Sequence, residues 1–131
     1  MIVADVNLLA YLYLPGRFTD PVEALLLKDP DWAVPRLWRS EFNNILAAYM
    51  RKGLLPLDDA LVIQRQAHIV VAGNEYDIPA AVVLRLAKQS GCSACDCEYV
   101  ALAEHLDVKL VSGDAKLMKA FPGRSIALED A

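Results

Sequence analysis

The sequence predicts an α/β protein with three layers, in which helices cover both faces of a central, mainly parallel sheet. Short apolar segments typical of buried strands alternate along the chain with longer segments that have helical periodicity. Parallel strands need connections that cross a face of the sheet, and helices usually supply them. The alternation therefore predicts roughly four to five short strands between two helical layers. The 131 residues suffice for a single domain, residues 1–131, with a substantial core.

The first quarter of the chain is predicted as strand, helix, helix and strand. A strand over Ile2–Asp5 continues directly into a helix over Val6–Leu14, which ends at a Pro-Gly pair. Asp20, followed by a proline at the first helical position, is the expected N-cap of a second helix that extends to about Lys28. Trp32–Val34 is then a short apolar strand.

Two helices are expected in the middle of the chain. The first begins at Pro35, carries its large apolar side chains on one face, and ends at basic residues followed by Gly53. Asp58 is the expected N-cap of the second, which continues to about Val71.

The last part of the chain returns to alternating helices and strands. One helix is enclosed by Pro79 and Gly91, and another covers about Cys95–Leu106. The remaining elements are a strand over Lys109–Ser112, a short helix over Asp114–Ala120 and a strand over Ser125–Leu128.

The composition limits where the protein works and what it binds. No apolar stretch reaches the roughly 18 residues that a membrane span requires, and the chain has no signal-peptide pattern, so we expect a cytoplasmic protein without membrane contact. The apolar fraction of 56% predicts a dimer or a bound partner. The net charge of −4 argues weakly against nucleic acid, but basic residues cluster locally, so charge alone does not decide that question.

Four acidic residues lie where predicted elements begin or on helix faces: Asp5, Glu41, Asp96 and Asp114. The first and last directly follow short apolar segments, so both fall at the carboxyl edge of the sheet, where ligands of such proteins bind. Burying a carboxylate is costly unless its charge is compensated. The four acids together therefore predict a shared divalent cation.

Helical geometry orients two of these acids. At about 100° per residue, Asp96 shares the buried stripe of Tyr99, whereas Glu98 and His105 point the other way. Glu41 lies at the border of an apolar helix face and has no basic residue three or four positions away, so no helical ion pair explains it.

Each acid also has a purely structural interpretation. Asp96 could complete a capping box with Ser93, and Asp114 could cap the helix that follows it. Asp5 could be a turn residue and Glu41 a solvated helix residue. Taken singly these interpretations are as good as a metal site, but four such coincidences in one chain are less so.

Carboxylates that hold Mg²⁺ or Mn²⁺ are suited to phosphodiester hydrolysis, which needs an activated water and charge relief on the phosphate. Mg²⁺ keeps several waters, so we expect Asp5 and Asp96 to contact the ion directly. Glu41 and Asp114 would orient waters or hold a second ion. Without metal, mutual repulsion predicts one raised carboxyl pKa, and divalent metal should stabilise the fold.

Three cysteines, Cys92, Cys95 and Cys97, suggest an alternative zinc or redox site. Zinc normally takes four ligands, and His105 lies on the opposite helix face from Asp96. Buried, reduced thiols are therefore the default expectation. His68 has no partner for catalysis in the sequence and is assigned to structure.

The motifs around the acids resemble those of PIN domains. The likeness rests on Asp5-Val6-Asn7 after the first strand, Glu41 in the helix after the second strand, the segment Ser93–Ala103 with its Asp-x-x-Tyr-x-Ala-Leu-Ala pattern, and Leu110–Asp114. It covers essentially the whole chain and extends to the VapC-type toxins of bacterial and archaeal toxin–antitoxin pairs.

The resemblance implies a PIN-like fold and a metal-dependent endoribonuclease whose four acids coordinate Mg²⁺ or Mn²⁺. Asn7 and Ser112 match polar positions that support the acids or an ordered water. The chain departs from the usual pattern in two ways, with serine at 112 where threonine is common and cysteines on both sides of Asp96.

The resemblance further implies RNA as substrate, a cognate antitoxin that blocks the site, and a homodimer. Candidate contact surfaces are Ala10–Leu14, Glu23–Leu27 and Leu61–Val71. Four basic residues near the predicted site are candidates for RNA phosphate contacts: Arg36, Arg39, Lys116 and Lys119.

Other functions stay open at this point. The chain could be a PIN-like module that has lost catalysis and binds RNA or a partner, because function depends on the site rather than the fold. It could also be an RNA-processing nuclease outside a toxin–antitoxin system, or a nuclease that acts on DNA.

Overall fold

A parallel five-stranded sheet forms the centre of the protein in the computed structural model, which describes residues 1–131. The strands lie in the order β3-β2-β1-β4-β5, and every neighbouring pair is parallel. Their bounds are Ile2–Ala4 (β1), Trp32–Pro35 (β2), Glu75–Tyr76 (β3), Leu110–Ser112 (β4) and Ser125–Ala127 (β5).

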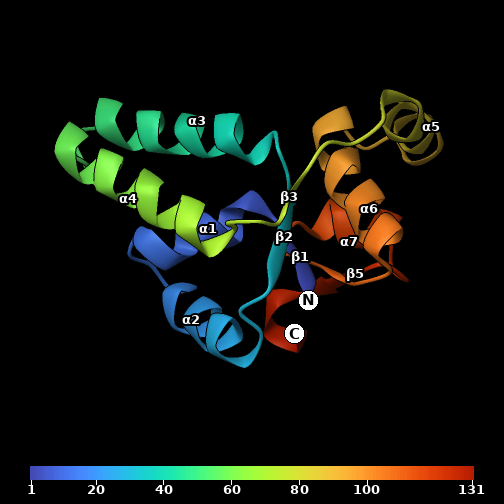
Figure 1. Cartoon of the computed structure of the whole chain (residues 1–131), viewed down its shortest axis with the longest axis horizontal. Coiled ribbons are helices and arrows are strands. Elements are labelled where there is room, and N and C mark those ends of the chain that lie inside the picture. Colours follow the sequence, from blue (N-terminus) through green and yellow to red (C-terminus); the bar gives the residue numbers. More distant parts are fainter.

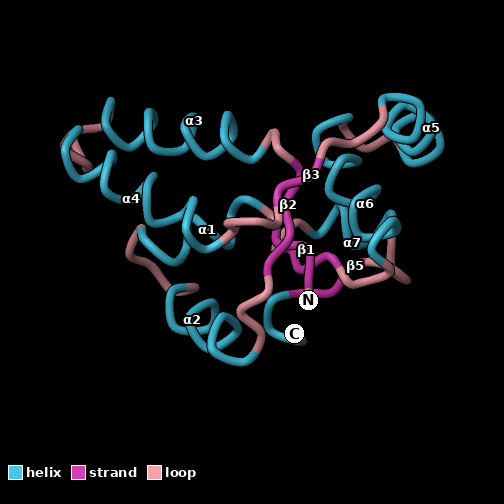
Figure 2. The backbone as a smooth tube through the Cα atoms, viewed as in Figure 1, coloured by secondary structure: helices cyan, strands magenta, loops and turns pink.

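Helices cover both faces of this sheet, as the sequence predicts. In Figure 1, α1 to α4 lie on one side of the strands, and α5, α6 and α7 lie on the other. Figure 2 shows the strands as a thin central layer between two helical layers. The helices are Val6–Tyr13 (α1), Thr19–Lys28 (α2), Trp38–Arg51 (α3), Leu57–Val70 (α4), Ala80–Ser90 (α5), Ala94–Leu106 (α6) and Ala115–Ala120 (α7), and a 3₁₀ helix, η1, covers Leu128–Asp130. None of these helices combines the length and the apolar character needed to cross a bilayer.

The central strands are apolar throughout because both of their faces are covered. Val3 and Ala4 of β1, Val34 of β2, and Leu110 and Val111 of β4 are all buried. Strands covered on both faces have continuous apolar sequences rather than alternating ones, which is why these segments are short, uninterrupted and recognisable in the sequence. The core on both sides of the sheet therefore fixes β1 and β4 rigidly.

The order of the strands reverses between β1 and β4. From β1 the chain moves outward to β2 and β3, and it then crosses back through α5 and α6 to place β4 on the other side of β1. Such a switch point leaves a crevice at the carboxyl ends of the two strands, where open α/β sheets bind ligands. Asp5 follows β1 and Asp114 follows β4 by one intervening glycine, so both lie at this crevice.

Most predicted elements are present, but three predicted helix starts are wrong. Asp20 and Asp58 make no side-chain cap. Each helix begins two residues earlier than expected, at Thr19 and at Leu57, so its aspartate lies in the first turn. There the carboxylates favour the positive end of the helix instead of capping it. Pro35 belongs to β2, and α3 begins only at Trp38.

Strand β3 is the one strand absent from the prediction, which also lacked the short 3₁₀ helix η1. It has two residues, Glu75 and Tyr76, which is too short for any periodicity, and it exists because β2 offers an open edge at Val34 and Pro35. The Glu75 carboxylate accepts hydrogen bonds from the Arg39 guanidinium at 2.6 and 2.7 Å and from Trp38 Nε1 at 2.7 Å. It thereby ties the edge of the sheet to the first turn of α3.

We expect Glu75→Ala to lower the free energy of unfolding by roughly 1 kcal/mol at pH 7, a value that allows for solvent around Arg39. The Arg39 guanidinium lowers the pKa of Glu75 from 4.5 to about 2. Folding therefore favours the ionised carboxylate. The contribution should be complete above pH 4.5 and disappear as the pH falls toward 2. Urea denaturation at both pH extremes measures it.

Asp77→Ala is the matched control, because the Asp77–Arg36 ion pair is exposed on both sides, at 83% and 50% of the side chains. Asp77→Ala should lower the free energy of unfolding by less than Glu75→Ala does. Equal costs for the two substitutions at pH 7 would contradict the assigned role of Glu75.

Candidate functional site

All four predicted acids lie at the amino-terminal ends of helices. Asp5 is the N-cap of α1 and Asp114 the N-cap of α7, and both accept backbone hydrogen bonds through their side chains. Glu41 lies in the first turn of α3, and Asp96 in the first turn of α6. Four positive helix ends thus carry the four carboxylates, a favourable placement for negative charge.

Asp5 is fixed by β1, by α1 and by β4. Its backbone N–H donates to the Val111 carbonyl at 3.1 Å, and its Oδ1 accepts from the Asn7 backbone N–H at 3.2 Å. Its Oδ2 accepts from the Ser112 hydroxyl at 2.8 Å. Burial raises the pKa of Asp5, and the nearby charges of Asp96 and Asp114 add to the rise, although the Ser112 and Asn7 hydrogen bonds oppose it.

Ser112 links two of the acids through one hydroxyl group. This fully buried side chain ends β4. Its Oγ accepts from the Asp114 backbone N–H at 3.0 Å while donating to Asp5. Asp114 Oδ1 in turn accepts from the Lys116 and Leu117 backbone N–H groups at 2.9 and 3.3 Å. The support predicted for Ser112 is thus present as hydrogen bonds, whereas the Asn7 side chain makes none within the protein.

Glu41 lies on α3, on the opposite side of the sheet from α6, and its carboxylate is held by Tyr99 of α6. The Tyr99 hydroxyl donates to Glu41 Oε1 at 2.7 Å. Burial raises the pKa of the Glu41 carboxyl, and the charges of Asp5, Asp96 and Glu98 raise it further. Burial and the adjacent Glu41 also raise the pKa of Tyr99, so its hydroxyl stays protonated and remains a donor.

Asp96 lies one turn into α6 and is half-buried. The Ser93 hydroxyl accepts from the Asp96 backbone N–H at 3.1 Å, so Ser93 caps the helix, but the Asp96 carboxylate makes no return hydrogen bond that would complete a capping box. The expectation that Glu98 points away from the site is wrong. Glu98 is half-buried, and its charge acts on Glu41. Helix α6 packs against the sheet and against α5.

No basic side chain compensates these acids. The four ion pairs of the protein involve Asp29, Asp77, Glu75 and Asp107, and none involves an acid of this cluster. Two of these carboxylates, Asp5 and Glu41, have raised pKa values, and carboxylates without an internal cation fit a hard divalent ion in donor chemistry. As the side chains lie, no three acidic, histidine or cysteine side chains are grouped so that they could hold a metal ion together.

A PIN domain model matches residues 2–122, which include all four acids and the strands and helices that carry them. This chain belongs to the PIN domain family. Its sequence is 28% identical over 124 residues to Ribonuclease VapC3 of Pyrobaculum aerophilum, an alignment that covers 92% of this chain and 95% of that protein. The resemblance to PIN domains predicted from the motifs is therefore confirmed.

Solved structures agree with the fold of this PIN domain. The crystal structure of PAE2754 from Pyrobaculum aerophilum superposes with a TM-score of 0.77 at 22% identity, covering 98% of this chain and 83% of that one. A toxin–antitoxin complex from Klebsiella pneumoniae contains a chain that superposes with a TM-score of 0.69 at 16% identity, with all of both chains covered. At these identities the superpositions establish the architecture.

The four basic residues predicted to contact RNA differ in their surroundings. Arg36 and Arg39 are already paired, with Asp77 and Glu75, whereas Lys116 and Lys119 of α7 are exposed and make no ion pair. Phosphate contact by either arginine would compete with its carboxylate partner. The two lysines are free of that competition.

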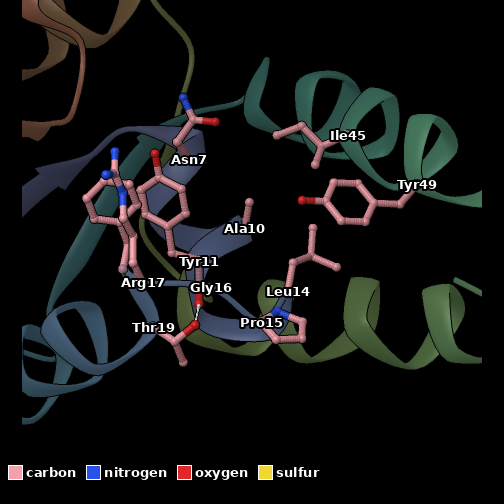
Figure 3. A pocket seen from close by; sticks show the side chains of 11 residues that line it. Asn7, Ala10, Tyr11, Leu14, Pro15, Gly16, Arg17, Thr19, Ile45 and Tyr49 are labelled. Carbon is pink, nitrogen blue, oxygen red and sulfur yellow. Dashed lines mark hydrogen bonds between the residues drawn. The ribbon is translucent and has the colours of Figure 1, made fainter. Parts of the chain in front are cut away.

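Sequence reasoning missed a pocket beside the acids. It lies between α1, the α1–α2 loop and α3, with Tyr11, Arg17 and Tyr49 in its lining (Figure 3). The Tyr11 hydroxyl lies beside Gly113, the residue before Asp114. Tyr11 and Tyr49 are 38 positions apart in the sequence, so only an aromatic residue within α1 and another within α3 could have hinted at it.

The cysteines are free thiols with different surroundings. Cys92 and Cys97 are buried, as expected, but Cys95 is exposed, contrary to expectation. It falls on the outer side of the first turn of α6. His68 packs its ring against Trp38, with the centroids 4.7 Å apart, in keeping with a structural role.

We expect Glu41→Gln to raise the melting temperature by a few degrees at pH 7.5 in the absence of divalent metal. The amide keeps an acceptor for Tyr99 and removes a charge that burial disfavours. Because the folded-state pKa of Glu41 is raised, the wild type loses stability as the pH rises through that pKa. The gain from the substitution should therefore shrink at pH 4. Thermal melts in EDTA measure both values.

Glu104→Gln provides the control, because Glu104 is exposed on α6. It should change the melting temperature little at either pH. A Glu41→Gln protein that is less stable than the wild type at pH 7.5 would show that Glu41 is not under electrostatic strain.

Proposed function

We propose that this PIN domain is a metal-dependent endoribonuclease that hydrolyses RNA phosphodiester bonds. One observation carries the proposal: four carboxylates at four helix ends lie around the switch point of the sheet, near enough for their charges to raise the pKa of Asp5 and Glu41, and none has a basic ion-pair partner. A purely structural cluster of buried acids would be expected to have neutralising partners. The relationship to Ribonuclease VapC3 supports RNA as the substrate.

The residues present fit Mg²⁺ or Mn²⁺. Asp5 and Asp96 are proposed as the carboxylates nearest the ion, with Glu41 and Asp114 orienting water or holding a second ion. When bound, such an ion lowers the pKa of a water, relieves charge on the phosphate and stabilises the leaving oxygen. Mg²⁺ keeps several waters and takes one or two direct carboxylates, so the proposal needs only Asp5 and Asp96 in direct contact with the ion.

The rest of the chain keeps the carboxylates in place. The Ser112 hydroxyl orients the Asp5 carboxylate by donating to it and fixes the Asp114 backbone by accepting from its N–H. The Tyr99 hydroxyl orients the Glu41 carboxylate in the same way. Backbone N–H groups at three of these helix ends are themselves held by the side chains of Asp5, Ser93 and Asp114. Substrate and ion would thus be oriented by groups that do not need to move.

We further propose that the protein is the toxin of a toxin–antitoxin pair and forms a homodimer. The fold shared with the Klebsiella pneumoniae toxin–antitoxin complex supports an antitoxin partner. Exposed apolar side chains offer contact area, with Leu27 of α2 88% exposed and Ile69 of α4 74% exposed. Ala10 and Leu14 are instead buried within the protein, which confines the first candidate surface to its exposed edge.

Cleavage of total RNA in the presence of Mn²⁺ tests the proposed activity. The wild type should produce discrete fragments, and Asp96→Asn should lower the rate by roughly 100-fold or more, because it removes a ligand charge. EDTA should abolish cleavage. Ser112→Ala should lower the rate by roughly 10- to 100-fold, the usual cost of losing a group that orients a ligand.

Glu104→Gln is again the control and should cleave like the wild type. If the folded wild-type protein binds Mn²⁺ but cuts only DNA, then DNA replaces RNA as the proposed substrate. Cleavage that persists unchanged in Asp96→Asn would refute the assignment of the site.

Mn²⁺ should also stabilise the wild-type fold, because it binds only the folded site. At a 10- to 100-fold excess over Kd the gain is on the order of 1–3 kcal/mol. The gain should be larger at pH 7.5 than at pH 5, since protonated carboxylates with raised pKa values do not bind metal. Asp5→Asn should remove most of it. Thermal melts with and without Mn²⁺ provide the measurement, and equal gains in both proteins would contradict the site.

A further inference from the structure

We propose that the pocket between α1 and α3 binds one base of a single-stranded RNA, next to the phosphate that the carboxylates receive. The inference rests on the proposed function and assigns to the same site a means of choosing where the RNA is cut. Single-stranded bases are recognised by stacking on rings or guanidinium groups and by hydrogen bonds to their edges. The pocket presents all of these groups.

The pocket has the size and shape for a base. Its volume is about 340 Å³, at the lower end of the range typical of small-molecule sites. Figure 3 shows Tyr11 and Tyr49 on opposite sides of it, with Ala10 and Leu14 between them. The apolar floor and the aromatic sides favour a flat ring over a charged or branched group.

One side of the pocket is a stack of flat groups. The rings of Tyr11 and Phe18 lie with their centroids 4.8 Å apart, and the Arg17 guanidinium lies 4.6 Å from the Phe18 centroid. The Thr19 hydroxyl donates to the Tyr11 carbonyl at 3.0 Å and so fixes the loop against α1. The stack is therefore held in place by the protein before any ligand arrives.

Polar groups in the pocket have no partner within the protein. The Tyr11 and Tyr49 hydroxyls and the Asn7 amide make no internal hydrogen bond, and Arg17 makes no ion pair. The Tyr49 hydroxyl points into the pocket in Figure 3. The Tyr99 hydroxyl, by contrast, is engaged by Glu41. The pocket thus offers donors and acceptors together with one free cation.

The pocket opens beside the carboxylates. Asn7 lines it and donates its backbone N–H to Asp5 at 3.2 Å. A Cβ on Gly113 would lie 3.7 Å from the Tyr11 hydroxyl, which places Tyr11 against the turn that carries Asp114. Tyr11, Arg17 and Phe18 also line a second and larger hollow of about 1030 Å³ on the far side of the stack. Arg17 thus borders both hollows next to the turns that carry Asp5 and Asp114.

Arg17 supplies the attraction that the acids lack. RNA is repelled by a cluster of carboxylates, so binding needs a cation that is not already neutralised. Arg36 and Arg39 are paired with carboxylates, whereas Arg17 has none. It can contact a phosphate or stack on a base without breaking an ion pair. The combination favours RNA over a protein segment as the occupant.

Cleavage of labelled 12-nucleotide RNAs of randomised sequence, with Mn²⁺, tests this inference. Sequencing the products should show a base preference at one position beside the cut. Tyr49→Phe should weaken that preference and lower kcat/KM for the preferred RNA by about 5- to 10-fold, the scale of one hydrogen bond. Arg17→Gln should raise KM for every sequence. An abasic nucleotide at the preferred position should impair the wild type but make little difference to Tyr49→Phe.

Two matched substitutions serve as controls. Tyr13→Phe removes a hydroxyl from α1 outside the pocket, and Arg65→Gln removes an exposed arginine from α4. Both should behave like the wild type. Fluorescence anisotropy of the same RNAs with the Asp96→Asn protein, alone and combined with Tyr49→Phe, measures binding without cleavage.

The outcomes separate the two proposals. Cleavage by the wild type with Tyr49→Phe and Arg17→Gln indistinguishable from the controls overturns the base site and leaves the pocket to a protein partner. If the wild type does not cleave RNA but binds it in a way that depends on Tyr49 and on the base, the proposed enzyme activity is overturned and the base site is supported. Neither cleavage nor binding overturns both.

Discussion

The rest of the site depends on one constraint: four helices begin where the parallel sheet ends. In a parallel sheet covered by helices, strands run in one direction and helices run back, so helix amino termini gather at the carboxyl edge. The order β3-β2-β1-β4-β5 brings two of these ends together at the gap between β1 and β4. Their positive ends lower the cost of holding carboxylates there. That contribution is partial, because burial and mutual repulsion still raise the pKa of Asp5 and Glu41.

The unfavourable charge is contained by a few neutral hydrogen bonds. Ser112 and Tyr99 donate to Asp5 and Glu41 at 2.8 and 2.7 Å, which orients each carboxylate without neutralising it. A lysine or arginine in either position would neutralise the carboxylate at a desolvation cost of its own, and it would occupy the place of a cation from solution. Neutral donors therefore preserve the capacity to bind metal, and the fold tolerates the residual strain because its core is continuous on both sides of the sheet.

Local signals explain why so much of this arrangement could be predicted from sequence. Asp5 and Asp114 follow apolar strands, and Asp96 follows the capping residue Ser93, so each has a signature within a few residues. Strand β3 has none, because it is formed by pairing with β2. The direction of Glu98 was also mispredicted, because helical periodicity gives one buried face and does not show a neighbour such as Glu41, which is 57 positions away in the sequence.

The same distinction applies to the basic residues, and it bears on how RNA would be held. Along the chain, Arg17 and Arg39 look alike, each a single arginine near an aromatic residue. Only the fold shows that Glu75, 36 positions away, neutralises Arg39, whereas Arg17 lies over Phe18 with no carboxylate. Since an arginine already bound bidentately must lose that pair to bind phosphate, the net attraction for RNA comes from the unpaired one. The path of the RNA would then be set by Arg17 on one side of the acids and by the exposed Lys116 and Lys119 on the other.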